Sequence, residues 1–182
     1  MHIRILKVVF YSDLIKNVLI FFKLMKKENV MAVLGLSGVI VSVPSVDDFD
    51  QLPTTDANVI IDNHIIPACE SKGVKLSSYG NHVGKGSLSG VEKYDEEKAA
   101  HLLFNVERIQ KAFAALDAMV GQMSQYKTGS YGLKHTVEKY QGEYISNGDL
   151  IVAMLLKGYG ARFGKQTESM SVNCEFKAKV LV

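Results

Sequence analysis

Cysteines, net charge and uninterrupted hydrophobic runs are all scarce in this sequence. Only Cys69 and Cys174 occur among the 182 residues, and no CxxC pair is present. Two isolated thiols argue against a disulfide framework and fit a reducing compartment, where we expect both to be small buried residues. The net charge of +2 is too small to indicate a nucleic-acid partner by itself.

The most apolar stretch, residues 3–25, contains charged residues in every window of the roughly 20 residues that a bilayer requires. Lys23 also interrupts the apolar core that a signal peptide needs, and no clear cleavage site follows it. Two interpretations remain, a packed N-terminal element, which we favour, and an amphipathic helix on a membrane surface. Met31 offers an alternative natural start, with residues 1–30 as an upstream extension.

Charge is distributed in blocks along the chain. Residues 1–30 carry six basic side chains against Asp13 and Glu28, whereas residues 47–62 carry five aspartates and no basic residue. Such blocks are typical of solvated faces, so on their own they do not indicate a specific partner.

The strongest periodic signal predicts one long helix from Asp95, its expected cap, to about Gln125. Apolar residues recur there at alternating steps of four and three, which keeps them on one face. We expect this interaction face to pack against the chain's own helix at 147–157 or to form a homo-oligomeric seam, and we favour the first. The face consists of Leu102, Val106, Ile109, Phe113, Leu116, Val120 and Met123.

A capping box is predicted at Ser146, whose hydroxyl accepts from the backbone N–H of Asp149 while the Asp149 carboxylate reaches back. The helix at 147–157 is apolar on several faces, so we expect it to be buried, with Gly158 as its C-terminal cap. The remaining predicted elements are strands within 32–46 and 58–67, a Gly/Ser-rich loop at 71–90, a helix at 131–141 between Ser130 as cap and Gly142, and a strand at 172–182.

These elements predict an α+β fold, in which a C-terminal three-helix unit packs on a small sheet formed by strands from 32–66 and 172–182. The chain is expected to divide into an apolar basic N-terminal extension (1–30), a β-containing part (31–90) and a helical part that ends in a strand (91–182). The boundary between the last two is placed in the loop at 71–90.

Two short motifs resemble known sites without matching them. The segment from Gly80 to Gly86 has three residues between its first two glycines, where a phosphate-binding P-loop has four. Asp62-Asn63-His64 and Gly80-Asn81-His82 resemble the DxH and GNH boxes of metallophosphoesterases, but the intermediate GDxxD box is absent. We identify no catalytic residue and expect no cofactor; the first residues to test for metal are Asp62, His64 and His82.

Basic residues late in the chain suggest a nucleic-acid alternative. Helices 131–141 and 147–157 do not suit a helix-turn-helix, because the second is apolar where base-reading side chains are needed. A surface that grips phosphates without reading sequence would use Lys127, Lys134, Lys139, Arg162 and Lys165, with tyrosines nearby.

The segment Ser130–Tyr159 resembles small uncharacterised proteins of large DNA viruses and phages. The residues that carry the resemblance are Ser130, Tyr131, Gly132, Leu133, Lys134, His135, Glu138, Tyr144, Ser146, Asn147, Gly148, Ile151 and Gly158.

The resemblance implies a viral origin and brings no known active site. We therefore expect a non-enzymatic structural or assembly protein, a virion component whose partners are itself or other virion proteins. The alternatives are a sequence-nonspecific nucleic-acid-binding protein and a metal-dependent hydrolase. The expected location is the virion or host cytoplasm for a viral protein, and the cytoplasm otherwise.

Overall fold

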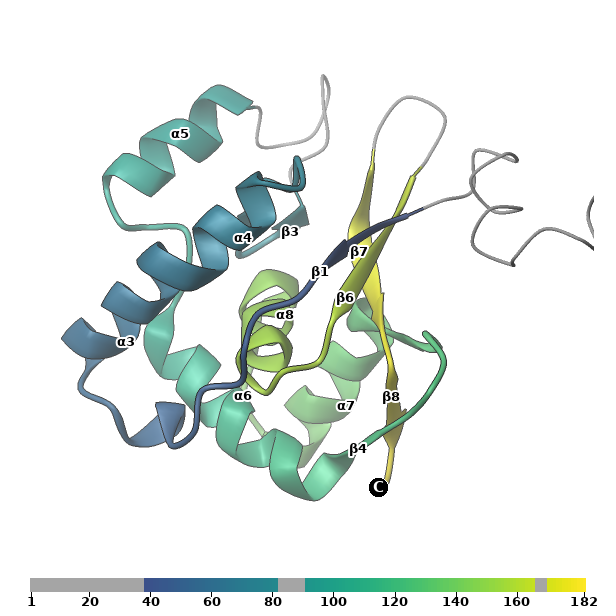
Figure 1. Cartoon of the computed structure of the whole chain (residues 1–182). Coiled ribbons are helices and arrows are strands. Elements are labelled where there is room, and N and C mark those ends of the chain that lie inside the picture. The colour runs from purple at the N-terminus through teal and green to yellow at the C-terminus, as the bar shows by residue number, and fades with distance from the viewer. Residues whose placement is uncertain (1–37, 82–90, 166–169) are drawn as a thin grey trace, which may run out of the picture. The chain divides into compact units, whose positions relative to one another are not determined.

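The computed structural model describes residues 38–81, 91–165 and 170–182, whose helices and strands are drawn in Figure 1. The predicted extension at 1–30 and both interpretations of residues 3–25 lie outside these residues. Gly38–Val182 forms one compact unit. The boundary predicted at 71–90 does not divide this unit, because described residues on both sides of that loop share one hydrophobic core. None of the described helices is long and apolar enough to cross a membrane.

The fold is an α+β mixture, as the sequence predicts. A four-stranded antiparallel sheet has the order β1 (Val39–Val41), β6 (Ala161–Lys165), β7 (Met170–Phe176) and β5 (Thr128–Gly129). Two smaller sheets pair β2 (Leu76–Ser77) with β3 (Gly80–Asn81), and β4 (Val120–Gln122) with β8 (Ala178–Val180). Strand β1 lies within the predicted segment 32–46, whereas β6 was not predicted.

Helix α8 (Asn147–Leu156) is buried along its whole length. It packs against α6 (Val106–Met119) and α7 (Ser130–Gln141), and these helices are the C-terminal three-helix unit. Figure 1 shows α8 between the four-stranded sheet and the helical segment that contains α3 and α4. The hydroxyl half of the predicted capping box is confirmed, because Ser146 Oγ accepts from the Asp149 N–H at 3.0 Å. On the carboxylate side, Asp149 Oδ1 accepts from the Asn105 N–H at 3.1 Å. Gly142 and Gly158 follow α7 and α8 with positive φ angles of 74° and 81°, as their predicted capping roles require.

The single long helix predicted from 95 to 125 is wrong, because the chain forms two helices there, α5 (Val91–Ala99) and α6. After α5, His101 takes a left-handed conformation with φ of 54°. Asn105 then caps α6, its Oδ1 accepting from the Arg108 N–H at 2.9 Å. Asp95, the predicted cap, lies inside α5, where it forms an ion pair with Lys75 at 2.9 Å.

The strand predicted at 58–67 is also wrong. Its residues belong to a helical segment made of α3 (Thr54–Ile60), a π-helical turn (Ile61–Ile65) and α4 (Ile66–Glu70). Buried Ala57, Ile61, Ile65 and Cys69 recur at every fourth residue, and this helical spacing prevails over the β-branched composition. The wider π turn absorbs the difference between a four-residue repeat and the 3.6 residues of an α-helical turn.

Ser130 does not cap α7 as predicted. Gly129 occupies the cap position, while Ser130 begins the helix and its buried Oγ accepts from the Cys174 N–H at 3.2 Å. The strand predicted at 172–182 is confirmed in part, as β7 and β8 with Cys174, Phe176 and Ala178 buried.

Candidate functional site

The residues predicted for metal binding do not come together in the described part of the chain. Asp62 lies in the π turn, and its Oδ2 is 3.0 Å from Nδ1 of His101. His64 is exposed in the same turn, and His82 lies outside the described residues. Among the residues that the structure describes, no group of three or more His, Cys, Asp or Glu side chains could hold a metal ion.

A small cavity lies beside the Asp62–His101 pair, with space for about one water molecule. Lys98, at its edge, is held by the Glu70 carboxylate at 2.7 and 2.9 Å. The cavity therefore suits an ordered water better than an organic substrate. It is lined by Asn58, Ile61, Asp62, Ile66, Lys98, His101, Leu103 and Phe104.

Both cysteines are buried, as the sequence predicts. Burial, together with the neighbouring Glu70 charge, raises the pKa of the Cys69 thiol to about 12. Burial also raises the pKa of Cys174, against an opposing hydrogen bond from Ser130. Both thiols are therefore protonated at neutral pH, a state that is a poor nucleophile.

The predicted interaction face is mostly buried inside the chain, against its own α8. The chain leaves the helix at Met119, and the next residue belongs to β4. Leu102 lies before α6 and is 69% exposed, and Met123 lies after β4 and is half-buried. The buried members of the face are Val106, Ile109, Phe113, Leu116 and Val120.

The basic residues predicted to bind nucleic acid lie on different elements of the fold. Lys134 is buried on α7, whose last turn carries the exposed Lys139. Arg162 lies on β6, paired with a neighbouring carboxylate, and exposed Lys127 precedes β5. Lys165 ends β6, and its side chain lies outside the described residues. The set therefore divides between a helix and a sheet.

A line of touching side chains runs along the outward side of α7. The rings of Tyr131 and His135 meet edge to face, with centroids 4.7 Å apart. His135 Nδ1 is 2.8 Å from one carboxylate oxygen of Glu138, and Lys134 Nζ donates to the other at 2.7 Å. Burial acts to raise the pKa of Glu138, but hydrogen bonds from Lys134, the Ile145 N–H and His135 hold it below its ordinary value.

Two cations flank the exposed ring of Tyr144 at one end of this line. Lys134 Nζ lies 4.8 Å from the ring centroid, and the Arg108 guanidinium carbon lies 5.3 Å from it. Tyr131 and Tyr144 are 57% and 62% exposed. We name the tyrosine–cation chain by its members, which are Tyr131, His135, Glu138, Lys134, Tyr144 and Arg108.

A second surface is the outward face of the four-stranded sheet. Ile40, Arg162 and Glu175 are paired across β1, β6 and β7, so their side chains share one side of the sheet. Arg162 lies 4.7 Å and Lys177 5.1 Å from the ring centroid of Tyr126. Exposed Lys177 follows β7, and exposed Lys179 lies on β8, so this side continues beyond the four-stranded sheet. We name the basic sheet face by its members, three cations and one carboxylate among them, which are Ile40, Tyr126, Arg162, Glu175, Lys177 and Lys179.

Sequence reasoning missed both surfaces as units. The signal for the sheet was the alternation of Glu175, Lys177 and Lys179 with buried residues, which places the three on one side. Nothing in the sequence brings Arg108 to Tyr144, because the strands β4 and β5 and the helix α7 separate them.

Comparison with known proteins assigns no family to this chain. No protein-family model, no curated protein and no solved structure matches it.

Proposed function

We propose that this chain is a non-enzymatic structural or assembly protein that acts through protein–protein contacts, as a virion component. The observation that carries the proposal is the tyrosine–cation chain on the outward side of α7. The resemblance of Ser130–Tyr159 to small viral proteins supports the virion assignment, since this segment includes α7 and Tyr144.

The composition of the tyrosine–cation chain is that of an interface hot spot. Tyrosine and arginine are enriched among the residues that dominate binding energies, because they combine a large contact area with a polar end. Tyr131 and Tyr144 each present more than half of their surface to solvent. Their neighbours His135 and Lys134 are fixed by Glu138, so little side-chain entropy remains to be lost on binding.

The alternatives have weaker support in the described residues. A metal-dependent hydrolase would need several ligands beside Asp62, but the described residues contain no group of three or more that could hold a metal ion, and the adjoining cavity holds about one water. Nucleic-acid binding would need uncompensated cations, but Lys134 and Arg162 are both paired with glutamates.

The test measures the mass of the full chain by size-exclusion chromatography with light scattering, alone and mixed with virion proteins. We expect complexes heavier than the 20.1 kDa chain. The double variant Tyr131→Ala/Tyr144→Ala should weaken them roughly tenfold or more. Mass spectrometry of purified virions should detect the protein.

Tyr79→Ala is the matched control, because Tyr79 is 60% exposed and lies between β2 and β3, outside α7. It should leave the complexes intact. A strict monomer at micromolar concentration that ignores virion proteins contradicts the proposal, as does an equal loss in Tyr79→Ala.

A further inference from the structure

The basic sheet face is an exposed protein surface with a mixed character. Its cations Lys177 and Lys179 are exposed and form no ion pair among the described residues, whereas Arg162 is paired with Glu175. Ile40, 46% exposed, adds an apolar side chain next to Arg162. An apolar residue and a glutamate beside cations suit a protein partner with carboxylates better than a continuous phosphate backbone.

The same chain carries a matching acidic surface. It consists of aspartates that lie between β1 and α3 and in the first turn of α3, namely Asp47, Asp48, Asp50 and Asp56. None of them forms an ion pair with another described residue. Because these four carboxylates have no cationic partner among the described residues, the acidic surface is complementary in charge to the basic sheet face.

This acidic surface is held in a fixed position on the core. The ring of Phe49 packs against that of Phe113, with centroids 5.6 Å apart. Gln110 of α6 donates from Nε2 to the carbonyl oxygens of Phe49 and Leu52, at 3.2 and 2.7 Å. A partner therefore meets carboxylates on a preorganised turn, which lowers the entropy lost on association.

We propose that the basic sheet face of one copy docks on the acidic surface of a second copy, so that copies join head to tail. The inference rests on the proposed assembly function and names one of its partners. Charge complementarity between two surfaces of one chain is the argument for this occupant.

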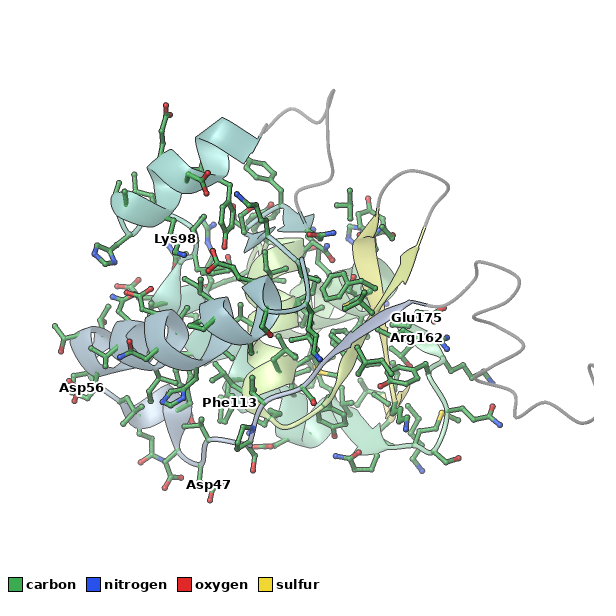
Figure 2. The ribbon with its side chains drawn as sticks, turned by 45° about the horizontal axis from the view of Figure 1, so that its top comes forward. Asp47, Asp56, Lys98, Phe113, Arg162 and Glu175 are labelled. Carbon is green, nitrogen blue, oxygen red and sulfur yellow. The ribbon has the colours of Figure 1, made fainter. Side chains whose placement is uncertain are left out.

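The positions of the two surfaces determine the kind of assembly. Figure 2 shows Asp47 and Asp56 on one side of the molecule and Arg162 and Glu175 on the other, with Phe113 between them. With its two surfaces on different sides, each copy presents one surface to one neighbour and the other surface to a second neighbour. The contact is heterologous and extends to a ring or a filament.

Charge reversal on each surface separately provides the test, with the full chain throughout. Asp47→Lys/Asp50→Lys reverses the acidic surface, and Lys177→Glu/Lys179→Glu reverses the basic sheet face. We expect the unmodified chain to exceed 20.1 kDa by light scattering at about 50 mM salt and to return to it at about 500 mM. Each variant alone should remain at the mass of a single chain, and an equimolar mixture of the two should associate again.

Lys72→Glu/Lys93→Glu is the matched control, because it changes the net charge equally at two exposed lysines outside both the basic sheet face and α7. It should associate like the unmodified chain. Equal loss of association in this control, or no recovery in the mixture, overturns the proposal. Single-stranded DNA bound at about 50 mM salt and released by Lys177→Glu/Lys179→Glu, without self-association, also overturns it by assigning the face to nucleic acid.

Failure here is separable from failure of the proposed function. A chain that stays at 20.1 kDa, yet forms complexes with virion proteins that Tyr131→Ala/Tyr144→Ala weakens, retains an assembly function and rejects only the head-to-tail contact.

Discussion

Helices α8 and α5 have ten and nine residues, but different forces hold them in place. Every residue of α8 is buried, whereas Tyr94 is the one buried side chain among those described in α5. The Tyr94 hydroxyl donates to Glu70, and Lys98 pairs with the same carboxylate. Burial of apolar area contributes about 25 cal/mol per Å², whereas an exposed ion pair contributes about 0–1 kcal/mol. The stability of the fold therefore resides in α8, and α5 is expected to open locally.

The largest expected effect is on the core of α8. Ile151→Ala should lower the free energy of unfolding by about 2–5 kcal/mol, because Ile151 is fully buried and its loss leaves a cavity. Leu102→Ala, at a residue 69% exposed between α5 and α6, should change it by less than about 0.5 kcal/mol. Urea unfolding measures both, and similar losses would refute the ranking of the two regions.

The cap of α8 should come next in size. Ser146→Ala removes the acceptor for the Asp149 N–H inside the core, which should cost about 1–2 kcal/mol in urea unfolding. Asn105→Ala removes the equivalent acceptor at the exposed start of α6 and should cost less, because water replaces the lost hydrogen bond. A larger loss at Asn105 would contradict this interpretation.

A third effect depends on pH. Burial raises the pKa of Asp149 above its ordinary 3.8, against hydrogen bonds from Ser146 and the Asn105 N–H and the charge of Arg108. The folded state therefore holds this proton more tightly than the unfolded state, so stability falls as pH rises from the ordinary value through the raised one. Asp149→Asn removes this loss. Its stability relative to the unmodified chain should increase between about pH 3 and about pH 7 in urea unfolding; a constant difference would contradict the shift.

Local signals in the sequence predict the α8 region well. Ser146 and Asp149 are three residues apart, the helix between them and Gly158 is one continuous apolar run, and Gly158 follows its end. Each of these cues lies within about one helical turn of the feature that it determines. The prediction of one long helix failed because the periodicity of its apolar residues continues across a break. The signal for that break was Asn105, a favoured cap residue followed by Val106 and Glu107.

The surfaces could not be predicted, because they depend on pairing between distant segments. Ile40, Arg162 and Glu175 become neighbours only through the register of β1, β6 and β7, and β6 itself has no strong alternation. Likewise, the β-branched residues around Ile61, which favour a strand, obscured the helical spacing of the buried residues at every fourth position.

The fourth prediction concerns helix α5, where the expected change in the global free energy of unfolding is smaller. Lys98→Met breaks the ion pair with Glu70, whose partners are 41% and 34% exposed, so global stability should change by less than about 1 kcal/mol. Amide hydrogen exchange in α5 should nevertheless accelerate, because the pair joins α5 to α4. Lys93→Met is the control, since Lys93 pairs with Glu97 inside α5 and has no ion pair with another element among the described residues. Equal acceleration in both variants would contradict docking through Lys98.

The smallest effect concerns His101, which adopts a left-handed conformation at the end of α5. That conformation costs an L-residue about 1–2 kcal/mol and costs glycine little. The opposing contribution is the contact with Asp62, where the two side chains are 71% and 38% exposed and the gain is about 0–1 kcal/mol. His101→Gly should therefore stabilise the chain by about 0.5 kcal/mol in urea unfolding. Asp62→Asn, which removes the carboxylate charge and leaves the backbone unchanged, should be neutral or slightly destabilising. Destabilisation by His101→Gly well beyond that of Asp62→Asn would mean that the histidine ring, rather than its backbone, determines how α5 ends.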